Sequence, residues 1–177
     1  MPRTDAVWDW GDWTTPSGPC GQCEAVVSCT SAGELCPAIL ALLQRWASAL
    51  MRPRVADAVG SPTSSVLERA VIIRHLVAGV AVRLGGMLHE GHPVLADWSV
   101  DGDGAGPPGD VPDPVQVAAD IEDAGRAVAA RLRAIAAAPA PRGAPGLGDV
   151  PDAVLVMARR LIHDLGHHLH EASAAAS

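Results

Sequence analysis

The chain contains no lysine, so all thirteen of its basic residues are arginine, and the acidic residues outnumber them to give a formal net charge of −7. The arginines are spread along the chain and do not gather into a basic stripe. Nucleic acids and anionic membrane surfaces attract proteins through such stripes. The composition therefore argues against both as partners.

The sequence also lacks a long apolar run. Arginine or glutamate interrupts each apolar stretch well short of the roughly eighteen residues that a membrane-spanning helix requires. The first segment, MPRTDAVWDWGDW, carries aspartate and tryptophan where a signal peptide has its apolar core. We therefore expect a cytoplasmic protein, in which the four cysteines are thiols or metal ligands rather than disulfides.

Phenylalanine and tyrosine are absent, and the chain has five tryptophans instead. Trp8, Trp10 and Trp13 lie together near the start, in a segment without helical periodicity. Such large rings gain stability when they leave water. We therefore expect residues 1–30 to form a non-helical arm that packs on a bundle made by residues 31–173, with Trp46 in its core.

Four stretches of the sequence repeat apolar residues at spacings of three and four, which is the period of an α-helix. They cover residues 35–51, 66–90, 115–138 and 152–172. Each has a start signal: Ser31 with Glu34, Ser65 with Glu68, Asp113 with Pro114, and Asp149 with Pro151. Linkers rich in Gly, Pro and Asp separate them, and no strand pattern is evident. We predict an all-α four-helix bundle, with linkers long enough for a topology other than simple up-and-down.

The last stretch contains HDLGHHLHE, residues 163–171, in which His163 and His167 stand four residues apart. On a helix this spacing places two imidazoles on one side, a common way to present ligands to a metal ion. Histidines near a helix C-terminus also suit the helix dipole, which accounts for His168 and His170. Asp164 stands one turn before His168, and we expect it to be the surface partner of that histidine.

Several segments together resemble one family. MARRLIHDLGHHLHEA resembles the last helix of DinB-like four-helix proteins, whose relatives include thiol-dependent transferases and maleylpyruvate isomerases. DWTTPSGPCGQCE, SSVLERAVIIRHL, MLHEGHPVLADWSVD and DPVQVAADIEDAGRAVAARL resemble the arm, second helix, following connection and third helix of one bacterial subgroup. The likeness extends in order and spacing over residues 9–172. It implies a four-helix bundle that acts on a small molecule in bacterial specialised metabolism.

The resemblance also implies a metal site with one ligand missing. In the family, one histidine on the second helix and a His-x-x-x-His pair on the last helix hold the metal. The pair corresponds to His163 and His167, which would face the inside of the bundle, but the lone histidine corresponds to Ile72. A divalent ion such as zinc or nickel, and with it a thiol substrate such as mycothiol, is therefore expected only if another residue replaces that ligand.

Three alternatives stay open for the missing ligand. His75, about one turn beyond Ile72, replaces it. Cys20 and Cys23, which have Cys-x-x-Cys spacing, join the histidine pair in a set of two cysteines and two histidines. In the third alternative no metal binds, and the histidines line a pocket that has lost its ion.

Two more residues belong to the candidate site. Arg74 lies on the predicted second helix, where it would clamp a carboxylate of the substrate and act beside His75, His163 and His167. Trp98 corresponds to a family tryptophan near the pocket mouth and would stack on a ligand. We expect a metal-dependent thiol transferase or isomerase. The alternative is a metal-free bundle that acts as a cofactor-independent enzyme or a ligand-binding protein, and a homodimer stays open in either case.

Overall fold

The computed structural model describes residues 20, 28, 29, 31–52, 64–90, 112–138, 146–147 and 150–175. Within this part of the chain it contains four α-helices: α1 (Ala32–Leu50), α2 (Ser64–Glu90), α3 (Pro114–Ala137) and α4 (Asp152–Ala175). Each helix begins and ends within three residues of the predicted stretch. The predicted all-α four-helix class is confirmed. None of the described helices has the length and apolarity that crossing a bilayer requires.

Two of the predicted helix starts are confirmed in detail. At α1, the Ser31 backbone N–H donates to the Glu34 carboxylate over 3.2 Å, as in a capping box. At α3, the Asp113 carboxylate accepts from the Val115 N–H over 3.0 Å, and Pro114 occupies the first helical position. These contacts satisfy backbone N–H groups that have no partner within the helix.

The sequence did not predict the two short strands that precede α4. β1 (Gly146–Leu147) and β2 (Val150–Pro151) pair antiparallel, with Gly146 opposite Pro151 and Leu147 opposite Val150. The sequence shows no strand pattern at these residues, and a pair this small leaves the all-α class unchanged. Strands of two residues are too short to show the alternation of apolar and polar residues from which a strand is predicted.

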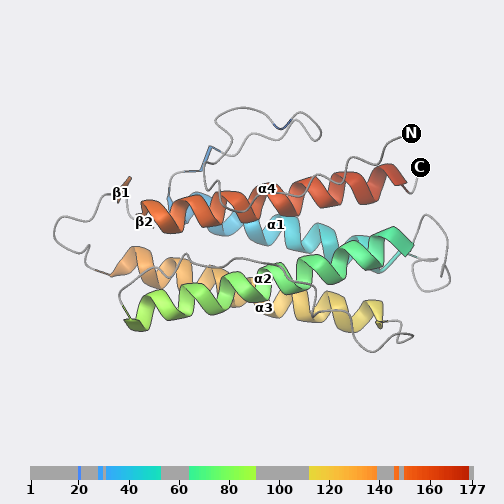
Figure 1. Ribbon diagram of the computed structural model, residues 1–177, viewed down its shortest axis with the longest axis horizontal. Coiled ribbons are helices and arrows are strands. Elements are labelled where there is room, and N and C mark those ends of the chain that lie inside the picture. The colour runs from blue at the N-terminus through green and yellow to red at the C-terminus, as the bar shows by residue number, and fades with distance from the viewer. Residues whose placement is uncertain are drawn as a thin grey trace, which may run out of the picture.

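The four helices pack in a ring in which α3 and α4 each contact both α1 and α2. Figure 1 shows that α1 and α4 run in one direction, whereas α2 and α3 run in the other. The end of α2 and the start of α3 therefore lie at opposite ends of the bundle. The arrangement differs from simple up-and-down, which the long linkers of the sequence allow.

The core consists of the predicted apolar stripes. Ten apolar residues that recur at spacings of three and four on α2 and α4 are buried, with exposed fractions of 9% or less: Val66, Ala70, Ile73, Val77, Val80, Leu155, Ala158, Ile162, Leu165 and Leu169. Trp46 on α1 is fully buried, as predicted, and its indole N–H donates to the Leu165 carbonyl over 3.0 Å. This bond fixes α1 against the middle of α4, which carries the histidine pair on its other side.

Two described points of the chain before α1 also contact α4. The Cys29 carbonyl accepts from the Arg159 side chain over 2.6 Å. Cys20 lies against His167. The three tryptophans at positions 8, 10 and 13 lie outside the described residues, so the packing of the arm as a whole stays a prediction. The contacts of Cys20 and Cys29 agree with it.

Candidate metal centre

The helix α4 is buried on two opposite sides. Leu165 is fully buried and faces the core. His163 and His167 each stand two residues from Leu165, which turns them by about 200° around the helix axis. The prediction that the pair faces the inside of the bundle is therefore wrong, because the apolar stripe of α4 occupies that side. The two histidines are nevertheless only 5% and 4% exposed.

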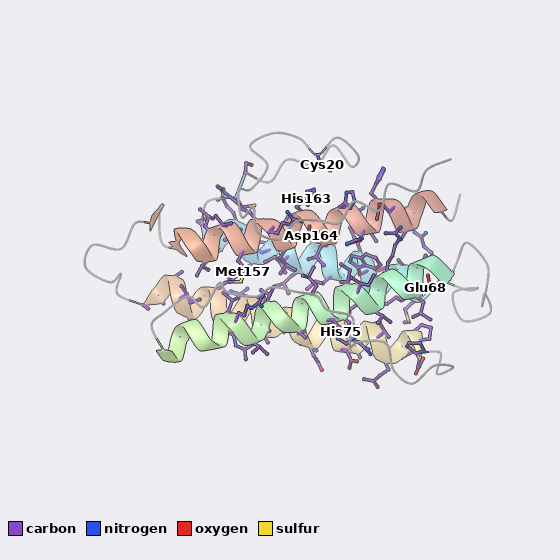
Figure 2. The ribbon with its side chains drawn as sticks, viewed as in Figure 1. Cys20, Glu68, His75, Met157, His163 and Asp164 are labelled. Carbon is purple, nitrogen blue, oxygen red and sulfur yellow. The ribbon has the colours of Figure 1, made fainter. Side chains whose placement is uncertain are left out.

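Cys20 lies over the side of α4 that carries the histidines. Figure 2 shows Cys20 and His163 near each other, with Cys20 on the side of α4 away from α2. The Cys20 Sγ is 3.7 Å from Nδ1 of His167, and one potential ligand atom from each of Cys20, His163 and His167 lies within 4.8 Å of the other two. A tetrahedral zinc site, with Zn–S of about 2.3 Å and Zn–N of about 2.05 Å, separates sulfur from nitrogen by roughly 3.6 Å. The three residues thus form a group that could hold a metal ion.

One nitrogen of His163 is available for a ligand. Its Nδ1 donates to the Asp164 carboxylate over 3.1 Å. Its Nε2 is buried and has no hydrogen-bond partner among the described residues. An imidazole that carries its proton on Nδ1 has a lone pair on Nε2, which is the form that binds a metal. Leaving such a buried atom without a partner costs about 1–3 kcal/mol, a cost that a bound metal would remove.

The electrostatic surroundings of His163 favour positive charge. The hydrogen bond to Asp164 raises the pKa of His163, burial opposes that rise, and the neighbouring Cys20 adds to it, so that the pKa lies above its usual value. The groups that favour a proton on this imidazole also favour a metal cation beside it. The charges around His163 and the arrangement of the three donors therefore both favour a bound cation.

Asp164 is not the surface partner of His168 that the sequence suggested. It is 6% exposed, and its carboxylate accepts from His163 and from Arg160, the latter over 3.0 Å. Arg160 stands one turn earlier on the same side of α4 and supplies the positive charge that this buried carboxylate needs. His168 contacts Arg69 and Glu171 instead.

His167, the second imidazole of the group, also lies beside a carboxylate. Nε2 of His167 is 3.4 Å from Glu171, which also forms an ion pair with Arg69 of α2. Both histidines thus contact an acidic side chain through one ring nitrogen. Sequence reasoning missed Arg160 and Glu171, although their spacings of four residues from Asp164 and His167 were a visible signal.

The structure does not bring Arg74 and His75 to the histidine pair. Their side chains lie 3.3 Å from each other, and Arg74 is 3.4 Å from Asp120 on α3. Figure 2 shows His75 well apart from Cys20 and His163. Among the described residues, the group that could hold a metal consists of Cys20, His163 and His167, without His75.

Ile72, the position at which the resemblance implies a missing ligand, is not part of this group. Ile72 is 44% exposed, so it does not share the buried surroundings of the two histidines. Among the described residues, the potential third donor beside the histidine pair is Cys20, 147 residues before His167, and no residue of α2 joins this group. Cys23 and Trp98, the other two candidates from the sequence, lie outside the described residues.

Comparison of the chain with protein-family models, with curated proteins and with solved structures finds no match. A function for this chain therefore rests on the geometry of Cys20, His163 and His167.

Proposed function

We propose that the protein binds one divalent transition-metal ion through Cys20, His163 and His167, with Zn²⁺ as the ion that suits these donors best and Ni²⁺ as the second candidate. One thiolate and two imidazoles are ligands that zinc prefers to oxygen donors. The observation that carries the proposal is the buried Nε2 of His163, which has no hydrogen-bond partner among the described residues. It belongs to a side chain that already lies beside a sulfur and a second imidazole.

We further propose that this centre serves small-molecule chemistry of the thiol-transfer kind. Three protein ligands leave one tetrahedral position for a substrate, as in catalytic zinc sites. A zinc ion held by Cys20, His163 and His167 would supply the positive charge that lowers the pKa of a substrate thiol. The resemblance of the sequence to DinB-like thiol-dependent transferases supports a thiol such as mycothiol as the substrate.

The residues of the chain would contribute charge and exclusion of water. Cys20 supplies one negative charge as a thiolate, so a divalent ion keeps a net positive charge that attracts an anionic substrate. The two imidazoles are almost completely buried, which strengthens electrostatic interactions at the site. Arg160 and Arg69 neutralise the carboxylates that hold the imidazoles.

The Cys-x-x-Cys spacing favours one competing function. If Cys23 supplies a fourth ligand, the site is closed and structural, and the metal fastens the segment before α1 to α4. Such a centre would stabilise the fold and would not bind a substrate thiol. The number of thiolates on the metal distinguishes the two functions.

Metal analysis of the purified full-length chain tests the first proposal. We expect one equivalent of zinc or nickel in the wild type, and loss of most of it in Cys20→Ala, His163→Ala and His167→Ala. Two matched controls, His170→Ala and Cys29→Ala, remove the same residue types outside the group and should keep the metal. If the wild type contains no metal and takes up neither Zn²⁺ nor Ni²⁺, this proposal is wrong. The metal-free enzyme or ligand-binding alternative then takes its place.

Cobalt substitution tests whether the site is open. The intensity of the sulfur-to-cobalt absorption band scales with the number of thiolates, so we expect the band of one thiolate, unchanged in Cys23→Ser. Addition of a small thiol should then raise the intensity toward that of two thiolates. A band of two thiolates that falls by half in Cys23→Ser, and does not respond to added thiol, would establish the structural site instead.

A further inference from the structure

The two imidazoles of the group contact their carboxylates through different ring nitrogens. His163 uses Nδ1 to donate to Asp164 over 3.1 Å, which leaves Nε2 as the atom for a ligand. His167 has the opposite arrangement: Nε2 is 3.4 Å from Glu171, and Nδ1 is the atom that lies 3.7 Å from the Cys20 sulfur. The two rings are nearly parallel, with 22° between their planes and 5.5 Å between their centres.

Each carboxylate is itself held by an arginine. Asp164 accepts from Arg160, one turn earlier on α4, and its side chain is 8% exposed. Glu171 pairs with Arg69, which belongs to α2, and both of these side chains are 31% exposed. The Glu171 carboxylate also lies 3.3 Å from His168. The Asp164 arrangement is therefore buried within one helix, whereas the Glu171 arrangement joins two helices nearer the surface.

We propose that Asp164 and Glu171 are positioning residues that select opposite ligand atoms, Nε2 of His163 and Nδ1 of His167, for one metal ion shared with Cys20. This inference rests on the proposed metal centre. A carboxylate that accepts from one ring nitrogen keeps the proton there, so the other nitrogen has its lone pair toward the ion. The same hydrogen bond orients the ring and increases the basicity of the ligand nitrogen.

Cadmium provides a direct probe of the ligand atoms. In the full-length chain, loaded with ¹¹³Cd²⁺ and labelled with ¹⁵N in its histidines, a scalar coupling appears only between the metal and the nitrogen that binds it. We expect coupling to Nε2 of His163 and to Nδ1 of His167, and no coupling at His168 or His170. Coupling through the same type of nitrogen in both rings would overturn the proposal.

Metal affinity, measured by competition with a chelator, tests the role of each carboxylate. Loss of a carboxylate that orients a metal-binding histidine weakens affinity by about 10- to 100-fold. We expect Asp164→Ala at the upper end and Glu171→Ala at the lower end, because Asp164 is the more buried of the two. Asp164→Asn and Glu171→Gln retain an oxygen that accepts from the imidazole, so they should recover part of the loss and keep the wild-type pattern of coupling.

Asp120→Ala is the matched control, since it removes an arginine-paired carboxylate far from the group and should leave affinity unchanged. A structural role alone would destabilise the variants without changing which nitrogen couples to cadmium. Equal affinities in the wild type, Asp164→Ala and Glu171→Ala would refute the positioning role while the metal centre stands. A wild type that takes up no Cd²⁺, Zn²⁺ or Ni²⁺ would refute both.

Discussion

Two groups of polar side chains in this bundle share histidine, arginine and aspartate and differ in what they can do. The α4 group contains Cys20, His163 and His167, with Asp164 and Arg160 beside them. The α2–α3 group contains Arg74, His75, Gln116 and Asp120. Its members bond to one another: Arg74 to His75 and Asp120, and Gln116 to Asp120 over 2.7 Å.

The difference lies in burial and in which atoms already have a partner. Arg74 and Asp120 are 26% and 38% exposed, whereas the side chains of His163 and Asp164 are 7% and 8% exposed. In the α2–α3 group, water can satisfy any polar atom that the protein does not. In the α4 group, a buried nitrogen has no partner among the described residues, and a sulfur lies beside it. Histidine, arginine and aspartate together therefore indicate a site only where burial leaves a donor atom to be satisfied.

The largest expected difference between the two groups is in their response to metal removal. Zinc at one hundred times its dissociation constant stabilises the folded state by about 2.7 kcal/mol, which corresponds to roughly 5–11 °C in Tm for a domain of this size. We expect a chelator to lower the Tm of the wild type by that amount, as measured by calorimetry. The Tm of His163→Ala should be low whether or not chelator is present, like that of the chelator-treated wild type. The Tm of His75→Ala should fall with chelator as that of the wild type does. If the Tm of His75→Ala no longer responds to chelator, the metal lies in the α2–α3 group, and the proposed centre is wrong.

The sequence was sufficient for the fold because each helix is determined locally. The caps at Ser31 and Asp113 and the apolar stripes of α2 and α4 depend on residues within a few turns of one another, and all are found in the structure. The two short strands before α4 escaped prediction because they have no periodicity.

The site was only partly predictable because it joins distant parts of the chain. The pairing of His163 with His167 follows from their spacing, but the approach of Cys20 to that pair depends on a contact across 147 residues. The direction of the pair was also misjudged. The family resemblance suggested that it faces inward, whereas a rotation of about 200° from Leu165 puts it on the outer side of α4.

A smaller difference is expected when each group loses its aspartate in the metal-free protein. Asp164→Ala leaves the buried His163 Nδ1 without its acceptor and removes one partner of Arg160, and such losses cost about 1–3 kcal/mol. Asp120→Ala breaks a half-exposed pair, for which about 0–1 kcal/mol is typical. Urea unfolding of the two variants in the presence of chelator measures both free energies. Equal values would show that the polar contacts of the α4 group are no stronger than ordinary surface pairs.

The smallest effect is expected from Ile72→His, the substitution for which the family resemblance and the structure make opposite predictions. If Ile72 stands where the third metal histidine belongs, the new imidazole should restore metal to a chain that lacks Cys20. The structure gives Ile72 an exposed fraction of 44% and completes the group with Cys20, so a histidine there enters solvent on α2. Surface substitutions of this kind change stability by less than about 0.5 kcal/mol.

We therefore expect Ile72→His alone to keep one equivalent of metal, and the double variant Cys20→Ala with Ile72→His to bind no more metal than Cys20→Ala does. Metal analysis of the three variants decides the matter. Suppose instead that the double variant recovers metal and loses it again when His163 is replaced by alanine. Then residues 72 and 163 would contribute to one common site, between α2 and α4. The difference between the α4 group and the α2–α3 group would then be one of degree, because α2 could supply a ligand as readily as the segment that carries Cys20.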